Sequence, residues 1–124
     1  MRLTDDEFGE LVDEALASMP GEFAPYMENV VVEVRPRPDQ AMLKSLRLPR
    51  GSLLLGLYSG VPLTRKSVRA PSEMPERIII FKDNVESVCR TRRQVVRQVR
   101  KTVLHEVGHH FGMGEEQLRK LGYA

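Results

Sequence analysis

The feature that most restricts the fold of this chain is a helical segment near its C-terminus. Valine recurs every three to four residues over positions 92–111, a period that predicts a helix with one apolar side. Thr91, with Gln94 three residues later, predicts its start, and Gly112 its end, because glycine readily adopts the left-handed conformation that turns a chain back. The alternative, a strand over 94–103, would need a period of two, which the sequence lacks.

All three histidines of the chain lie in the last turns of this predicted helix. Side chains four residues apart on a helix point the same way, so His105 and His109 should converge on one point, with Glu106 beside them. This H-E-x-x-H pattern is typical of zinc sites in which two imidazoles bind the metal and the glutamate acts as a general base. His110 projects onto the apolar side instead, and we expect it to be a buried, hydrogen-bonded core residue.

A third metal ligand is expected from the acidic residues that come after Gly112. In H-E-x-x-H-x-x-G-x-x-H proteins the last position supplies this ligand, and Glu115 occupies it here. Two histidines and one carboxylate form a catalytic set that leaves the fourth zinc position for water. The alternatives are that Glu116 is the ligand, or that both glutamates only complement the N-terminus of a short last helix, where carboxylates are favourable.

Length and composition predict one domain, residues 1–124. Although 41% of the residues are hydrophobic, no apolar run approaches the roughly 20 residues that span a bilayer, so no membrane partner is expected. The first residues, M-R-L-T-D-D-E, lack the apolar core of a secretory signal, and the single cysteine, Cys89, excludes an internal disulfide framework. These features predict a cytoplasmic protein.

The net charge of +2, from 19 basic and 17 acidic residues, is too small to demand a nucleic-acid partner. Basic residues do gather in and just before the long helix, at Arg90, Arg92, Arg93, Arg97, Arg100 and Lys101. We interpret them as a solvated helix face. The alternative is a phosphate-binding strip, but no aromatic residues are interleaved with them to support it.

The rest of the chain predicts short helices and strands. Apolar spacing after the capping pair Thr4 and Glu7 predicts a first helix over 5–19. Apolar and β-branched runs predict strands over 29–34, 52–58 and 78–81. Further short helices are expected over 41–46, over 83–89 with Asp83 and Glu86 as a capping box, and over 114–123, and a loop over 64–75.

Three segments carry a resemblance to a known family: L-L-G-L-Y-S-G-V-P-L-T, P-E-R-I-I-I-F-K-D-N-V-E and V-L-H-E-V-G-H-H-F-G-M-G-E-E-Q-L. Together with the first helix and the N-V-V-V-E-V strand, they make the chain similar to the minimal zincin-like metallopeptidase family of small bacterial proteins. The resemblance implies an α+β fold in which a small mixed sheet packs against an N-terminal helix and a long active-site helix, with a short C-terminal helix. It also implies one Zn²⁺ bound by His105, His109 and an acid at the position of Glu115, with Glu106 as the base.

The chain departs from larger metzincins in the segment after the third ligand. Those enzymes place a methionine turn beneath the metal, whereas no residue after Glu115 is a methionine and Met113 precedes it. The floor of the site must therefore be built in another way. We expect a shallow, open site.

The expected function is hydrolysis of a peptide bond in a peptide or protein substrate, with Glu106 taking a proton from a zinc-bound water. The substrate is expected to align along an exposed edge of the strand over 78–81. Tyr58, Tyr123 or an arginine could stabilise the oxyanion. For either tyrosine, however, we favour the interpretation that it is an amphipathic ring at the edge of the core. The rival function is a catalytically weak or inactive zinc-binding protein with a structural or partner-binding role.

Overall fold

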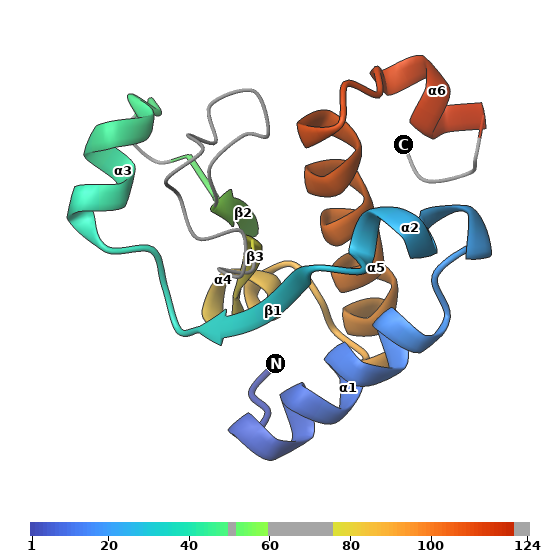
Figure 1. The fold of residues 1–124 in the computed structure, drawn as a ribbon. Helices are drawn as coiled ribbons and strands as arrows, with labels where there is room; N and C mark the ends of the chain where they lie inside the picture. The colour runs from blue at the N-terminus through green and yellow to red at the C-terminus, as the bar shows by residue number, and fades with distance from the viewer. Residues whose placement is uncertain (50–51, 60–75, 121–124) are drawn as a thin grey trace.

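The structure is a computed structural model that describes residues 1–49, 52–59 and 76–120. Its elements, in chain order, are α1 (Asp5–Ala17), the 3-10 helix η1 (Gly21–Phe23), α2 (Ala24–Met27), β1 (Val30–Arg35), α3 (Gln40–Leu46), β2 (Gly56–Ser59), β3 (Glu76–Phe81), α4 (Lys82–Ser87), α5 (Arg92–His110) and α6 (Glu115–Lys120). Figure 1 shows α1 and α5 crossing next to a small sheet. The α+β class predicted from the sequence is confirmed.

The sheet has the strand order β1-β3-β2, so the last strand in the chain lies in the middle. β3 pairs parallel with β1 and antiparallel with β2, and Ile78 has partners on both sides, Val32 and Tyr58. A strand paired on both sides has no free backbone groups for a third strand. The expectation that a peptide would add to the strand over 78–81 is therefore wrong, and β1 and β2 are the edge strands of the described sheet.

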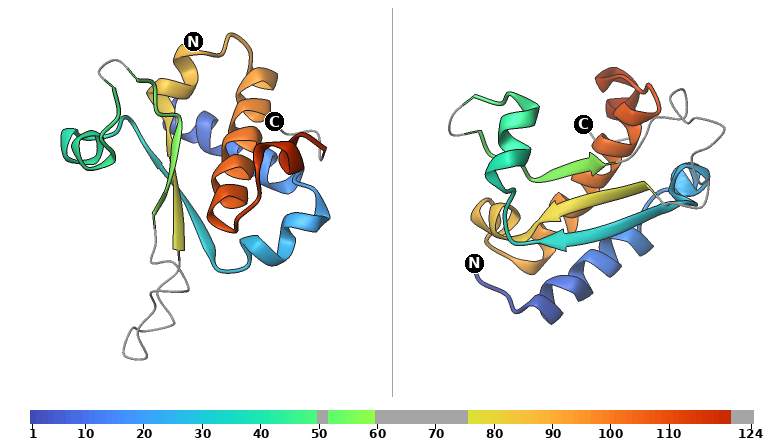
Figure 2. Two further views of the ribbon diagram at one scale, coloured as in Figure 1. Left: turned by 90° about the horizontal axis from the view of Figure 1, so that it is seen from above. Right: turned by 60° about the vertical axis from the view of Figure 1, so that its left-hand side comes forward.

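β3 is buried on both of its faces. Ile78 and Ile80 belong to the core shared with α1 and α5, and Ile79 and Phe81 alternate with them toward the other face. All four side chains are at most 1% exposed. Figure 2 shows α1 and α5 on one side of the sheet and α3 on the other. A continuous apolar run is what a strand covered on both faces requires.

α1 begins with the predicted capping box. The Glu7 N–H donates to Thr4 Oγ1 at 3.1 Å, and the Thr4 N–H donates to Glu7 Oε1 at 2.9 Å. These bonds with Thr4, and then one from Arg92 at 2.6 Å, lower the pKa of Glu7. Because Arg92 is the first residue of α5, this ion pair also joins the starts of the two long helices. α1 ends at Ala17, two residues earlier than predicted.

α5 forms as its valine period and its cap predict. The Gln94 N–H donates to Thr91 Oγ1 at 3.1 Å at the start of the helix. The valines of the apolar arc that are fully buried are Val95, Val99, Val103 and Val107. Valine is about 0.5 kcal/mol or more worse than alanine as a helix former, but burying its side chain contributes roughly 1.5–3 kcal/mol. Packing against α1 and the sheet therefore outweighs the weak local preference for helix.

Several shorter elements differ from their predicted form. The strand expected over 52–58 is confined to Gly56–Ser59, and α4 starts at Lys82 without a side-chain cap. The predicted capping box of α4 is wrong because Glu86 is used in a tertiary contact: it is 5% exposed, accepts the Leu3 N–H at 3.0 Å and lies 3.0 Å from Lys82 Nζ. The predicted loop over 64–75 lies outside the described residues. In the described ranges, no helix is long and apolar enough to cross a membrane.

Candidate metal centre

The last two turns of α5 bring two imidazole rings side by side. The ring centroids of His105 and His109 are 5.7 Å apart, with 27° between the ring planes. Two imidazoles that share one zinc ion at about 2.0–2.1 Å place their ring centres about 5–6 Å apart, so the observed spacing fits a common ion. His105 is half-buried and His109 is exposed. Only one ring of the pair is therefore exposed, and both the open site and metal binding stay predictions.

The chain turns back directly after these histidines. Gly112 has a φ of 82°, its N–H donates to the His109 carbonyl at 3.1 Å, and the Met113 N–H donates to the Gly108 carbonyl at 2.7 Å. This pair of bonds is a Schellman motif, which ends a helix with a left-handed residue. The predicted role of Gly112 is confirmed. The reversal leads into α6, which Figure 1 shows beside the C-terminal end of α5.

The third ligand predicted from the sequence, Glu115, is the first residue of α6. Its side chain lies outside the part of the chain that the structure describes, while the second candidate, Glu116, is exposed. Among the described side chains, no third His, Cys, Asp or Glu completes a metal-binding group with the two histidines. The assignment of Glu115 therefore stays a prediction.

α6 rests on α5 through one close contact. Leu118 is 0% exposed and covers Gly108, the residue directly before His109. A Cβ atom at this position would lie 2.8 Å from Leu118 Cδ2. Only a glycine gives the leucine this room. The contact holds the short helix that begins with Glu115 against the turn that carries the histidines.

Glu106, the predicted base, is half-buried on the same helix end. Burial raises the pKa of its carboxyl group, and nearby His109 opposes this by a smaller amount. A carboxylate with a raised pKa is a stronger base than an exposed one, which is what proton transfer near neutral pH requires. The electrostatics of Glu106 thus suit the role that the sequence predicts for it.

A second cluster, made of Tyr58, Glu76 and His110, lies next to the histidine pair. The Tyr58 hydroxyl donates to Glu76 Oε2, and the same oxygen lies 3.7 Å from His110 Nε2. The rings of Tyr58 and His110 stack with their centroids 3.9 Å apart and 14° between their planes. The cluster therefore ties the last turn of α5 to β2 and to the start of β3.

Two sequence-based interpretations are decided by this cluster. His110 has a side chain only 14% exposed, so it is largely buried as predicted, but the predicted hydrogen bond is not formed within the described residues: its Nε2 lies 3.7 Å from Glu76 Oε2, and its ring stacks on that of Tyr58. Burial, together with Glu76, raises the pKa of Tyr58, so its hydroxyl stays a donor, and it is already directed at Glu76. This favours the core-edge interpretation of Tyr58; Tyr123 lies outside the described residues. Sequence reasoning missed Glu76, the first residue of β3, because the predicted strand begins only at residue 78 and an acid before it gives no sign of burial.

β2 runs close along α5 because it begins with a glycine. A Cβ atom on Gly56 would lie 2.6 Å from Thr102 Cγ2 of α5 and 3.2 Å from the Ile79 carbonyl of β3. The buried Thr102 in turn accepts a hydrogen bond from Gln98 Nε2 at 3.1 Å. An edge strand therefore lies directly against the helix that carries the histidines.

A helix that carries two adjacent imidazoles and a carboxylate, packed against a small mixed sheet, is the arrangement of zincin-type proteins. The sequence profile of the zincin-like metallopeptidase family matches residues 27–123, and the chain belongs to this family. A conserved hypothetical protein from Thermus thermophilus has a similar solved structure, with a TM-score of 0.59 and 21% sequence identity over 95% of this chain and 99% of that one. At this identity the likeness shows the fold alone. No curated protein sequence matches the chain.

Proposed function

We propose that this protein is a zinc-dependent metallopeptidase that hydrolyses peptide bonds in a peptide or protein substrate. The observation that carries the proposal is the pair of imidazoles 5.7 Å apart, with the half-buried Glu106 on the same helix end. Membership of the zincin-like metallopeptidase family supports it. When bound by His105, His109 and Glu115, zinc would supply a Lewis acid and an activated water.

Each residue of the helix end has a defined task in this proposal. His105 and His109 would hold the metal, since their helical spacing places the two rings side by side. Glu106 takes a proton from the attacking water and passes it to the leaving amine. Because burial raises the pKa of Glu106, its carboxylate binds that proton more readily than an exposed carboxylate would.

The substrate is placed along β2 in this proposal. Within the described residues β2 pairs on one side only, with β3, and it lies against α5 at Gly56 and Thr102. A peptide that adds to the other edge of β2 gains backbone hydrogen bonds. This edge takes the place of the strand over 78–81 that the sequence suggested.

The proposal is tested by incubating the zinc-loaded protein with a peptide library and identifying cleaved products by mass spectrometry. Cleavage is expected for the wild type and for Glu22→Gln, a control in which an exposed glutamate outside the site loses its charge. It should be lost in Glu106→Gln, which removes the base but neither histidine. Cleavage at the wild-type rate in Glu106→Gln would contradict the mechanism.

The second candidate is a zinc-binding protein without peptidase activity that serves a structural or partner-binding role. The exposure of His109 favours it, because a surface site can be closed by a further protein ligand. The two candidates differ in coordination: structural zinc has four protein ligands, while a hydrolase keeps water in one position. X-ray absorption of the zinc-loaded protein, together with the library assay, separates them.

A further inference from the structure

The position of the second histidine of the pair depends on the very end of a helix. α5 ends at His110, so His109 lies in its last turn, while His105 lies one turn earlier. The last carbonyl groups of a helix lack partners within the helix, and helix ends therefore fray more readily than helix interiors. The spacing of the two imidazoles thus depends on what fixes this last turn.

The two histidines differ in how their neighbours along the helix are packed. His105 follows Val103 and Leu104, whose side chains are both 0% exposed. His109 is itself exposed, and the residue before it is a glycine. The residue after it, His110, has a side chain only 14% exposed. Of the two direct neighbours of His109, only His110 therefore has a side chain that can anchor the backbone.

The ring of His110 is packed against residues of the sheet. It stacks on the ring of Tyr58 in β2, with the centroids 3.9 Å apart and 14° between the planes, and its Nε2 lies 3.7 Å from Oε2 of Glu76 in β3. The ring of Phe111 meets it edge-on, with the centroids 5.0 Å apart. Tyr58 and Glu76 are each paired with a neighbouring strand. The ring of His110 thus connects the last turn of α5 to a fixed point of the sheet.

The contacts around this ring are polar and directional, which suits a positioning role. Glu76 is 7% exposed, and burying a carboxylate is unfavourable unless it is hydrogen-bonded. The Tyr58 hydroxyl donates to it, and this bond restricts the orientation of the ring on which His110 stacks. Apolar side chains of similar volume could fill the same space with less desolvation. They would not, however, set the orientation of the rings as a satisfied polar contact does.

We propose that His110 is a positioning residue for the metal centre. Held by Tyr58 and Glu76, it fixes the last turn of α5 so that the ring of His109 stays beside that of His105. This inference rests on the proposed function and adds to it a residue that neither binds the metal nor touches the substrate. Ligands that are already in place bind a metal ion more tightly, because less conformational freedom is lost on binding. His110 therefore contributes to zinc affinity from outside the ligand set.

The test is the zinc affinity of purified variants, measured by competition with a chromophoric chelator. His110→Ala removes the ring and should weaken zinc binding about ten-fold, as is typical when a residue that orients a metal ligand is lost. His110→Phe has no ring nitrogen but can still stack on Tyr58, and should retain most of the wild-type affinity. Wild-type affinity in His110→Ala would overturn the proposal. Equal losses in the two variants would also overturn it, because His110 would then be a zinc ligand itself.

Tyr58→Leu tests the same contact from the sheet. It removes the ring on which His110 stacks and changes no residue of α5. We expect it to weaken zinc binding as His110→Ala does, and it replaces that variant if His110→Ala fails to fold by circular dichroism. Unchanged zinc affinity in folded Tyr58→Leu would contradict the positioning role.

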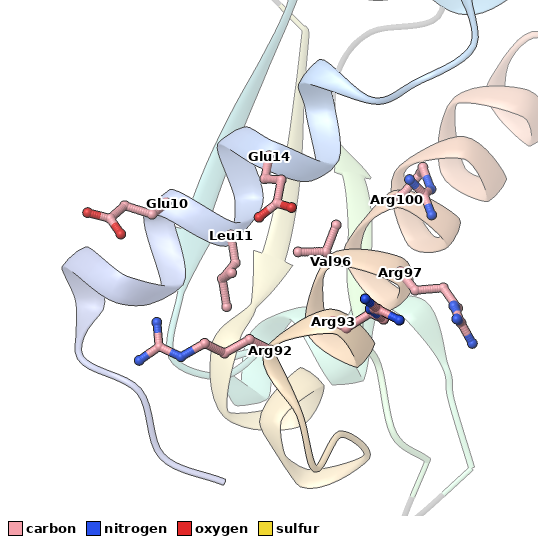
Figure 3. Close-up of a pocket in the computed structure, with 8 residues that line it drawn as sticks. All are labelled: Glu10, Leu11, Glu14, Arg92, Arg93, Val96, Arg97 and Arg100. Atoms are coloured by element: carbon pink, nitrogen blue, oxygen red, sulfur yellow. The ribbon is translucent and has the colours of Figure 1, made fainter.

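Leu11→Ala is the control for lost stability. Leu11 is 7% exposed and lines the groove between α1 and α5 that Figure 3 shows. The residues that α5 contributes to this groove extend only to Arg100, about 15 Å along the helix from His110. The substitution should lower the midpoint of urea unfolding and leave zinc affinity unchanged. A loss of affinity as large as that in His110→Ala would refute the proposal, because general destabilisation would then explain both.

The outcome for His110 can be told apart from the outcome for the proposed function. Zinc affinities that follow the expected pattern, in a protein that cleaves no peptide of the library, would refute the peptidase alone. Peptide cleavage by the wild type, with unchanged zinc affinity in His110→Ala, would refute the positioning role alone.

Discussion

The contact between α6 and α5 predicts that the effect of Gly108→Ala on the free energy of unfolding depends on the residue at position 118. A Cβ atom on Gly108 would lie 2.8, 3.2 and 3.4 Å from Cδ2, Cδ1 and Cγ of Leu118. Alanine is favoured over glycine within a helix by about 1 kcal/mol, but crowding a packed contact costs about 1–3 kcal/mol. Gly108→Ala alone should therefore change the free energy of unfolding by between about zero and a loss of 2 kcal/mol.

The same substitution should stabilise the protein once Leu118 is shortened. Leu118→Ala removes the atoms that the new methyl group would touch and by itself lowers the free energy of unfolding by about 2–5 kcal/mol. In the Leu118→Ala protein, Gly108→Ala should raise the free energy of unfolding by about 1 kcal/mol. The cycle therefore predicts a coupling of about 1–3 kcal/mol between the two sites, as expected for residues in contact.

Urea unfolding monitored by far-UV circular dichroism measures all four proteins of this cycle. An effect of Gly108→Ala that is the same in both backgrounds, within about 0.5 kcal/mol, would refute the close contact. Chelator competition on the same proteins gives their zinc affinities. We expect zinc to bind more weakly to Gly108→Ala than to the wild type, because the substitution displaces the helix that begins with Glu115.

The buried groups give three further predictions. Tyr58→Phe keeps the ring but removes the hydroxyl that donates to Glu76, and should lower the free energy of unfolding in urea by about 1–3 kcal/mol; an unchanged midpoint would contradict the contact. In metal-free protein, burial raises the folded-state pKa of Glu106, so its contribution to stability is fully present below the ordinary value of 4.5 and is lost as pH rises through the raised pKa. The melting temperature of Glu106→Gln minus that of the wild type should therefore increase as the pH is raised from 4.5 through the raised pKa. A decrease over the same pH range would disprove the pKa shift. Cys89 is 4% exposed and burial raises its pKa, so Ellman's reagent should react with it slowly until guanidinium unfolds the protein; rapid reaction in native buffer would contradict this.

The parts of the fold that the sequence predicts well depend on neighbouring residues. The start of α5 depends on Thr91 and Gln94, and its end depends on the backbone freedom of Gly112. The valine period fixes which side of this helix is buried. Because both histidines belong to the same regular helix, their side-by-side placement results from the same local information.

The parts that sequence reasoning missed depend on residues far apart in the chain. The parallel pairing of Val30 with Glu76 creates the central position of β3, and no local rule reveals it. The run Ile78–Phe81 did contain a signal, since apolar residues on both faces are typical of a central strand. The burial of Glu76 arises only when Tyr58 and His110 close over it. The assignment of Glu115 as the third metal ligand still rests on its position in the sequence motif and on the resemblance to the family.

The attachment of α6 has a consequence for the motion of this end of the protein. α6 has six residues, and Leu118 is the one buried side chain among those described in it. A segment with so little buried surface opens far more often than the core does. Amide hydrogens of α6 should therefore exchange with deuterium well before those of α5. If Glu115 binds zinc, metal binding would slow this exchange, and α6 would report whether the centre is loaded.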